Sequence, residues 1–254
     1  GGRPPMRRLA GVAAVGLVAA LLPFCWSGPL VGSGSGAATG GPLAGQRRAL
    51  RFGEGAAANR TTFKILQLAD LHYANGAETE CLDVAPDQRP CSDLNTTAFV
   101  ARLLAAERPD LVVLTGDNVF SKDCDDVAAS QRAWRRPLEA AGVPWALVFG
   151  NHDSEAQLSR AELMRIDMEA ELSLSRPGPA EVPGVGNYVL GVQDRAGRLG
   201  WALFFLDSGD YPPTAAAAWS GSKYDWIRAE QGAWLKAAAA AAELRGVPKI
   251  AFHH

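Results

Sequence analysis

The 254-residue sequence has few histidines, few cysteines and no excess of charge of either sign. Its formal net charge is −2, with 25 Lys and Arg against 27 Asp and Glu. Nucleic acids and anionic membrane surfaces attract concentrated basic charge, so neither is expected as a partner. No two of the four cysteines have the Cys-x-x-Cys spacing that is typical of a thiolate zinc site. A hydrophobic content of 48% is enough for one well-packed core.

The sequence has one long uncharged apolar run, from Leu9 to Phe24, which follows two arginines after Met6. The run is short for a membrane span, and small residues follow it, so residues 1–28 are predicted to be a secretory signal peptide. An uncleaved N-terminal anchor is the alternative, and no other stable membrane insertion is expected. Gly, Ser and Ala then dominate, which predicts a flexible linker over residues 29–59 and a folded domain over residues 60–254.

Three cysteines lie beyond the apolar run. Cys81 and Cys91 flank a polar, proline-containing loop that a disulfide could close. Cys124 is then left as a free thiol or pairs with a cysteine outside this sequence. Two Asn-x-Thr triplets, at Asn59 and Asn95, would be glycosylated in the secretory pathway. The segment SDLNTT around Asn95 is equally typical of a helix N-terminus.

Strand-like and helix-like segments alternate from Thr62 onward. The predicted strands are FKILQLAD, DLVVLTGD, VPWALVFGNHD, GNYVLGVQ, GWALFFLDSGD and VPKIAFHH. Helices are predicted from about Asp93 to a stop at Pro109, over residues 125–141 and 155–172, and in the alanine-rich segment WIRAEQGAWLKAAAAAAELR. This alternation predicts an α/β fold in which helices cover the sheet on both sides. In such folds the active crevice lies at the carboxyl ends of the strands.

Four predicted strands end in polar residues that can bind metal, and all four histidines of the sequence are among them. These residues are Asp70 with His72, Asp117, Asn151 with His152, and the pair His253 and His254. Each residue alone is more often a turn, a helix cap or a surface histidine. Together, at ends that should converge on one edge, they indicate a metal site. Carboxylate, imidazole and amide ligands suit Fe, Mn or Zn, and two such ions can activate water and clamp a phosphate.

The pattern DLH…GDN…GNHD…HH resembles the signature of the calcineurin-like metallophosphoesterases. Longer segments, including FKILQLADLHYANG and GNHDSEAQLSR, resemble the plant probable inactive purple acid phosphatases and the related fungal dosage-dependent cell-cycle phosphatases. The resemblance covers about residues 60–254. It implies a β-sandwich flanked by helices, with four layers in the order α/β/β/α. It also implies hydrolysis of a phosphorylated substrate by metal-bound hydroxide at a dinuclear centre, and a secreted, vacuolar or cell-wall location.

The resemblance also assigns a role to each site residue. Asp70 and His72 would bind the first metal ion, Asp117 would bridge both ions, and Asn151 and His254 would bind the second. His152 would stay off the metal ions and act on the leaving oxygen, and Asp153 would hold its imidazole in orientation. His253 would face away.

Two departures from the family pattern matter. Phe120 stands where the coloured purple acid phosphatases have a tyrosinate ligand, while His72 is a histidine that those enzymes lack. The last family motif, Gly-His-x-His, does not occur in this sequence, so we expect a fold and site that are incomplete at the C-terminus and a chain that is itself inactive. A non-catalytic phosphate- or protein-binding module is the alternative function. The natural substrate, the metal and the oligomeric state are left open.

Overall fold

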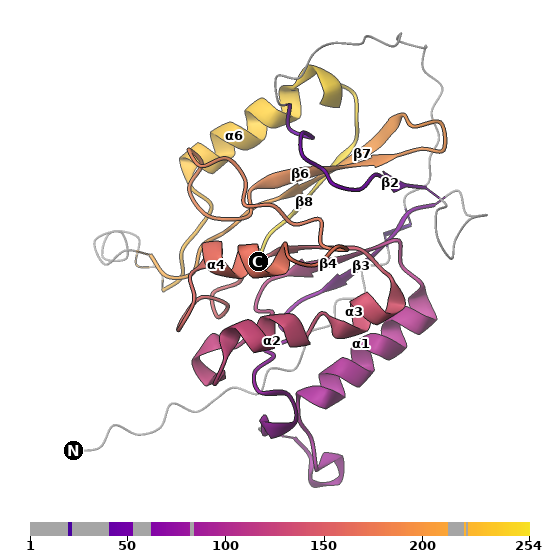
Figure 1. Cartoon of the computed structure of the whole chain (residues 1–254). Helices are drawn as coiled ribbons and strands as arrows, with labels where there is room; N and C mark the ends of the chain where they lie inside the picture. The colour runs from indigo at the N-terminus through magenta and orange to yellow at the C-terminus, as the bar shows by residue number, and fades with distance from the viewer. Residues whose placement is uncertain (1–19, 22–40, 53–61, 82–83, 213–220, 222) are drawn as a thin grey trace.

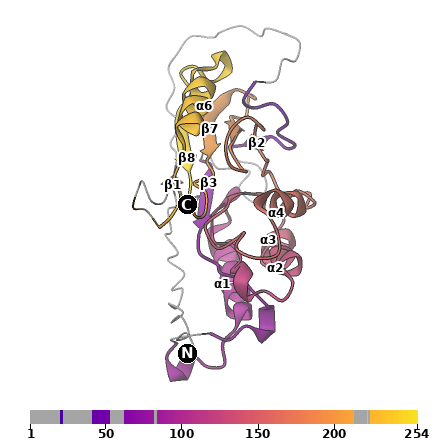
Figure 2. The same ribbon diagram turned by 90° about the vertical axis from the view of Figure 1, so that its left-hand side faces the viewer.

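Two β-sheets lie face to face between two layers of helices in the computed structural model of the chain (Figure 1). The structure describes residues 20–21, 41–52, 62–81, 84–212, 221 and 223–254. Of the predicted signal peptide or anchor, only Ala20–Leu21 is described, and Asn59 lies outside the described residues. A view turned by 90° also shows the helix layers on the outer faces of the two sheets (Figure 2).

The first sheet has the strand order β1-β3-β4-β5. Its three longer strands, β3 (Lys64–Leu68), β4 (Leu111–Thr115) and β5 (Trp145–Val148), are parallel, and β1 (Ala20–Leu21) pairs antiparallel with β3. Every residue of β4 and β5 is buried, which matches their unbroken apolar sequences. Their carboxyl ends therefore lie side by side at one edge of this sheet.

Four helices, α1 to α4, cover the outer face of the first sheet (Figure 1). The helix α1 (Asp93–Glu107) begins with a capping box of Ser92 and Asn95 and ends at Arg108, which has a left-handed backbone. The single helix predicted over residues 125–141 is instead α2 (Val127–Ala133) and α3 (Arg136–Ala141). Pro137 explains the break, because it lacks an N–H and its ring would collide with the carbonyl four residues earlier. The helix predicted over residues 155–172 is confined to α4 (Arg160–Asp167).

The second sheet has the strand order β2-β6-β7-β8. Its strands are β2 (Leu50–Arg51), β6 (Tyr188–Gln193), β7 (Leu199–Phe205) and β8 (Lys249–Phe252). The β6–β7 pair is antiparallel, whereas β2 and β8 run parallel to their neighbours. The helix α6 (Ala229–Ala240) covers the outer face (Figure 1).

The β2 strand lies within the segment that we predicted to be a flexible linker. Leu50 and Phe52 are buried between the two sheets, and the backbone N–H of Phe52 donates to the carbonyl of Gln193 at 3.0 Å. These two apolar side chains hold the segment in place. The ordered domain therefore begins earlier than residue 60.

Three apolar clusters separate the four layers. Leu66, Leu114 and Leu147 face α1 to α4, while their neighbours Ile65, Val113 and Val148 face the second sheet. The second sheet alternates in the same way, because Leu203 and Phe205 enter the inter-sheet cluster and Ala202 and Phe204 pack against α6. Alternation of side chains along each strand thus builds the predicted α/β/β/α arrangement.

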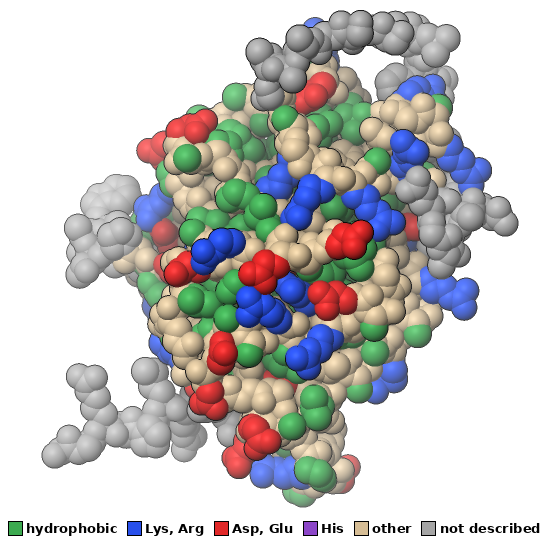
Figure 3. Space-filling model, in the orientation of Figure 1, with side chains coloured by type: hydrophobic (Ala, Val, Ile, Leu, Met, Phe, Trp, Pro, Cys, Tyr) green, Lys and Arg blue, Asp and Glu red, His purple; other side chains and the backbone are tan. Residues whose placement is uncertain are grey.

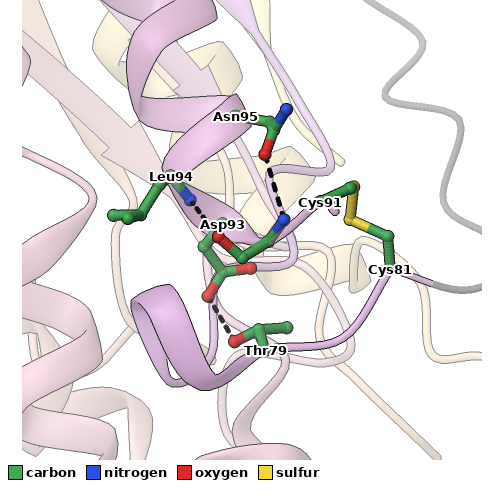
Figure 4. The surroundings of a disulfide bond; sticks show 7 residues. Thr79, Cys81, Cys91, Asp93, Leu94 and Asn95 are labelled. Carbon is green, nitrogen blue, oxygen red and sulfur yellow. Dashed lines mark hydrogen bonds between the residues drawn. A yellow bond between two sulfur atoms is a disulfide. The ribbon is translucent and has the colours of Figure 1, made fainter. Parts of the chain in front are cut away.

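A disulfide joins Cys81 to Cys91, a pairing that the sequence allowed but left open, and lies next to the N-terminus of α1 (Figure 4). The buried carboxylate of Asp93 accepts hydrogen bonds from the backbone N–H groups of Ala74 and Gly76 and from the Thr79 hydroxyl, at 2.7–2.9 Å. Asn95 lies in the capping box, where its side chain accepts from the backbone N–H of Ser92 at 3.0 Å. This network connects α1 to the loop that follows β3.

The described surface has mixed charge. On the face shown in Figure 3, basic and acidic side chains lie interspersed over the helices. Within the described part of the chain, none of the helices combines the length and the apolar character needed to span a bilayer.

Candidate metal centre

The polar residues at the strand ends meet at one edge of the sandwich, but they come from two sheets. Asp70, Asp117 and Asn151 follow β3, β4 and β5 of the first sheet, whereas His254 follows β8 of the second. The expectation that all four ends share one sheet is therefore wrong. His254 nevertheless reaches the first sheet, because its Nδ1 donates to the carbonyl of Thr115 at 2.9 Å.

Three of the site residues have a left-handed backbone. The φ angles are 56° at Asp70, 46° at His72 and 51° at Asp117. This conformation is costly for residues with a side chain and persists only where surrounding contacts impose it. Here the imposing contacts are backbone hydrogen bonds, in which the N–H of Asp70 donates to Gly116 at 3.0 Å and that of His72 to Asp117 at 2.9 Å. The loops after β3 and β4 thus hold each other.

Two glycines allow the strand ends to approach closely. A Cβ on Gly150 would overlap the carboxylate and the backbone nitrogen of Asp117. A Cβ on Gly116 would lie 2.5 Å from Nδ1 of His254. The glycines of the GDN and GNHD motifs are therefore required by packing around Asp117.

Asp117 is the centre of the cluster and is 3% exposed. Its Oδ2 lies 3.4 Å from Nε2 of His72, 3.6 Å from Nε2 of His254 and 4.0 Å from Nε2 of His152. Its Oδ1 accepts from the backbone N–H of His152 at 2.8 Å. Asp70 completes the group, with Oδ1 3.6 Å from Nε2 of His72.

This geometry fits a metal ion. Asp70, His72 and Asp117 each offer one ligand atom, and these atoms lie within 4.8 Å of one another. His254 donates its Nδ1–H to a backbone carbonyl, which leaves the Nε2 lone pair directed toward Asp117. A histidine that binds metal commonly has this second hydrogen bond.

The electrostatics of the cluster also favour a cation. Burial acts to lower the pKa of His72, but hydrogen bonds to Asp117 and Asp70 outweigh it and raise the pKa to about 9. Burial acts to raise the pKa of Asp117, but hydrogen bonds from His72 and from the His152 backbone outweigh it, so that pKa is lowered. The two carboxylates therefore stabilise positive charge between them, and a metal ion would replace the proton on His72.

Asp153 does not contact the imidazole of His152, contrary to the role that the resemblance implied. It is fully buried, and its carboxylate accepts from the backbone N–H groups of Asn118, Val119 and Gly150 at 2.7–3.0 Å. Burial raises the pKa of Asp153 to about 6. Asp153 thus fixes the loops after β4 and β5 relative to each other.

Glu155 is the residue that holds His152, a role that the sequence pattern did not predict. Its Oε2 lies 2.7 Å from Nδ1 of His152, and its Oε1 accepts from Lys122 Nζ at 2.7 Å and from the Tyr211 hydroxyl at 2.5 Å. Burial acts to raise the pKa of Glu155, but these hydrogen bonds outweigh it and lower the pKa. An acidic residue three positions after His152 was the available signal, because one tight turn brings such residues together.

The remaining residues surround the cluster. Phe120 lies against both imidazoles, with ring centroids 5.5 Å from His72 and 4.6 Å from His152. Asn151 is half-buried in the turn that also carries His152. His253 is exposed, and its Nδ1 lies 3.0 Å from the carbonyl of His254.

A buried ion pair fixes the turn that carries Asn151 and His152. Arg160 donates to Oδ1 of Asp207 at 2.8 Å and to the carbonyl of Gly150 at 2.7 Å. Asp207 follows β7, so this pair also ties the second sheet to the loop after β5.

Residues 63–251 match the family described as calcineurin-like phosphoesterase. The chain belongs to this family. The DLH, GDN and GNHD segments of the sequence lie at the ends of β3, β4 and β5. The predicted phosphoesterase fold, a sandwich of two sheets, is confirmed.

The chain is also similar to individual proteins of known sequence or structure. The chain is 42% identical over 204 residues to "Probable inactive purple acid phosphatase 29" of Arabidopsis thaliana, an alignment of 76% of this chain and 50% of that protein. It is 38% identical over 186 residues to "Phosphatase DCR2" of Saccharomyces cerevisiae, covering 68% and 31%. The chain spans about half the length of the first of these relatives. A solved dimetal phosphatase from Danio rerio has the same fold, with a TM-score of 0.52, 16% identity and coverage of 76% and 69%.

Proposed function

We propose that the protein is a metal-dependent hydrolase of phosphate monoesters that uses two ions of Fe, Mn or Zn. The observation that carries the proposal is the position of Asp117, whose Oδ2 lies within 4.0 Å of three imidazoles that follow three different strands. Asp70 and His72 would hold one ion with Asp117, and Asn151 and His254 would hold the other with Asp117. When bound, two such ions supply a Lewis acid for the phosphoryl oxygens and activate water as the nucleophile.

His152 is proposed to act on the leaving oxygen of the substrate. Glu155 binds its Nδ1, so its Nε2 faces the cluster, 4.0 Å from Asp117 Oδ2. From there Nε2 can donate a proton to the oxygen that leaves the phosphorus. Glu155 is a positioning residue in this scheme, because it would act through the imidazole that it holds.

A non-catalytic phosphate- or protein-binding module is the second candidate. The name "probable inactive", borne by relatives in Arabidopsis thaliana, favours it. The described part of the chain favours the enzyme, since the carboxylates and imidazoles at the cluster are present and close to one another.

The deciding experiment uses the protein at its full natural length. It is loaded with each candidate metal and assayed for phosphate release from phosphomonoesters, with Asp117→Asn as the matched variant. Turnover that is lost in Asp117→Asn supports the enzyme. Binding of inorganic phosphate without turnover under any metal would support the binding module instead.

A further inference from the structure

Two exposed tyrosines lie beside the candidate metal centre. Among the described residues, the exposed large hydrophobic side chains are Leu94, Phe99, Tyr211 and Tyr224. Tyr211 and Tyr224 stack on each other, with ring centroids 6.0 Å apart and an interplanar angle of 28°. They remain 37% and 47% exposed. Aromatic surface left in water next to a polar site is typical of a binding surface.

The tyrosine pair is joined directly to the site. The Tyr211 hydroxyl donates to Glu155 at 2.5 Å, and the same carboxylate holds Nδ1 of His152. Near Tyr224, the backbone N–H of Asp225 donates to the carbonyl of Asp210 at 3.2 Å, which keeps the two chain segments together. The two rings therefore form a surface that starts at the site and leads away from it.

Two ammonium groups accompany the rings. Lys122 Nζ lies 5.9 Å from the centroid of the Tyr211 ring, and Lys223 Nζ lies 5.1 Å from that of Tyr224. Lys122 is already paired with Glu155, so Lys223 is the ammonium group that would attract negative charge on a ligand, while the two rings favour a planar ring.

We propose that Tyr211 and Tyr224 form a subsite for the leaving group, and that this subsite selects phosphate monoesters whose alcohol part carries a planar aromatic ring. The inference rests on the proposed function, since the phosphate must lie at the metal centre for the ring to reach the tyrosines. Phosphotyrosine and a nucleoside 5′-phosphate share this chemistry. Tyr211 itself contacts Glu155 of the site, which favours a ring attached directly to the scissile oxygen, as in phosphotyrosine.

Hydrolysis rates test the subsite in the full-length, metal-loaded protein. The ratio of kcat/KM for phosphotyrosine to kcat/KM for phosphoserine is compared between wild type, Tyr224→Ala and Tyr224→Phe, so that the intrinsic reactivity of each ester cancels. Tyr224→Ala should lower the ratio roughly 5- to 20-fold, the range expected for loss of a stacking partner. Tyr224→Phe keeps the ring and should leave the ratio unchanged.

Phe99→Ala is the matched control. Phe99 is also exposed and has a cation over its ring, with Arg102 5.9 Å from the centroid, but it lies on α1. Its ratio should equal that of wild type. Adenosine 5′-phosphate distinguishes phosphotyrosine from a nucleoside 5′-phosphate as the ligand. If Tyr224→Ala lowers kcat/KM for adenosine 5′-phosphate but not for phosphotyrosine, the subsite binds a ring that is separated from the phosphate by a sugar. An unchanged ratio for both ring-bearing substrates in Tyr224→Ala would overturn the subsite.

Binding gives a readout that does not need turnover. Calorimetry with phenylphosphonate and propylphosphonate should show a preference for the phenyl compound in wild type and none in Tyr224→Ala, while propylphosphonate binds both equally. A phenyl preference in a protein that hydrolyses no phosphate monoester would refute the proposed function but support the subsite. Turnover without a phenyl preference would support the proposed function but refute the subsite.

Discussion

Oδ2 of Asp117 lies within 4.0 Å of three imidazoles of the candidate metal centre, so its replacement should have the largest effect on metal content. Asp117→Asn is expected to remove most bound metal and the activity with it, because one carboxylate would serve both ions. His152→Ala should keep the metal and lower kcat by about 10²- to 10⁴-fold, as expected for a lost general acid. Metal analysis and kinetics on the full-length protein measure both effects. An equal loss of metal in the two variants would place His152 among the ligands.

Glu155 gives a second prediction for a single residue. Glu155→Gln removes the charge that holds Nδ1 of His152, so kcat should fall by roughly 10- to 100-fold with metal content unchanged. Glu169→Gln is the control, because Glu169 forms an exposed ion pair with Arg132, at 3.0 Å. Wild-type kcat in Glu155→Gln would show that the imidazole is held by other contacts.

Cys124 provides a prediction on pH. Burial raises the pKa of its thiol from 9.0 to about 11, because the interior disfavours the thiolate. Only the thiolate is alkylated, so at pH 8 iodoacetamide should modify Cys124 about 100-fold more slowly than a cysteine in the unfolded chain. The rate should rise with pH up to the raised pKa. Mass spectrometry of the Cys124 peptide measures it, and a rate equal to that of the unfolded chain would contradict the burial.

The position of a site residue could be predicted from the sequence where a motif contains it. The contacts of a site residue could not be predicted where they depend on the direction of its side chain. The side chains of Asp70, His72, Asp117 and His254 lie close together, although His254 comes from the other sheet, and their roles as metal ligands stay a prediction. The partner of His152 was assigned to Asp153, yet that side chain turns toward buried backbone N–H groups. Local φ and ψ in the turn decide which acid faces the imidazole. The spacing of Glu155 from His152 allows this contact, but spacing alone does not favour Glu155 over Asp153.

At the scale of elements, the approach of β5 to β4 depends on Gly150. Gly150→Ala would push a Cβ into Asp117 and should lower the free energy of unfolding by about 1–3 kcal/mol, with loss of metal. Gly232→Ala is the control, since Gly232 lies within α6 and an added Cβ would meet nothing within 4 Å apart from its chain neighbours and the backbone of its own helix. It should raise stability by about 0.5–1 kcal/mol. Chemical denaturation separates them, and equal effects would contradict the steric account.

The elements were predictable in proportion to their length and pattern. The continuous apolar runs of β4 and β5 gave buried strands at the expected places. The two-residue strand β2 was missed, because two residues are too few to show a period. The break between α2 and α3 was missed although Pro137 signals it, because the apolar pattern continues across the break.

At the scale of the whole molecule, the contact between the two sheets should control both stability and the site. Phe205 lies in the inter-sheet cluster, with ring centroids 4.5 Å from Tyr188 and 5.4 Å from Phe252. Phe205→Ala should lower the free energy of unfolding by about 3–5 kcal/mol. It should also weaken metal binding, because β8 carries His254. The exposed Phe99 is again the control, and Phe99→Ala should change stability by less than about 0.5 kcal/mol. Unchanged metal affinity in Phe205→Ala would show that β8 is held independently of this core.

The arrangement of the two sheets was less predictable than the strands themselves. Strand-end residues could be expected to converge within one parallel sheet. The second sheet was predicted only from the family resemblance, because the periodicity of the sequence does not indicate which strands pair. Tertiary pairing of β7 with β8 brings His254 across the sandwich, and this pairing depends on contacts far apart in the sequence.

Because its candidate ligands come from both sheets, the candidate metal centre would report when the two sheets have closed on each other. Asp70 and Asp117 come together as soon as β3 and β4 pair, but His254 joins them only after β8 has docked and the sheets have closed. Contacts between such distant segments form slowly in two-state folding. In a refolding experiment, the first half-site would bind an ion weakly and early, and tight binding would appear with the last closure of the sandwich. A metal indicator dye would then measure the time at which the two sheets close.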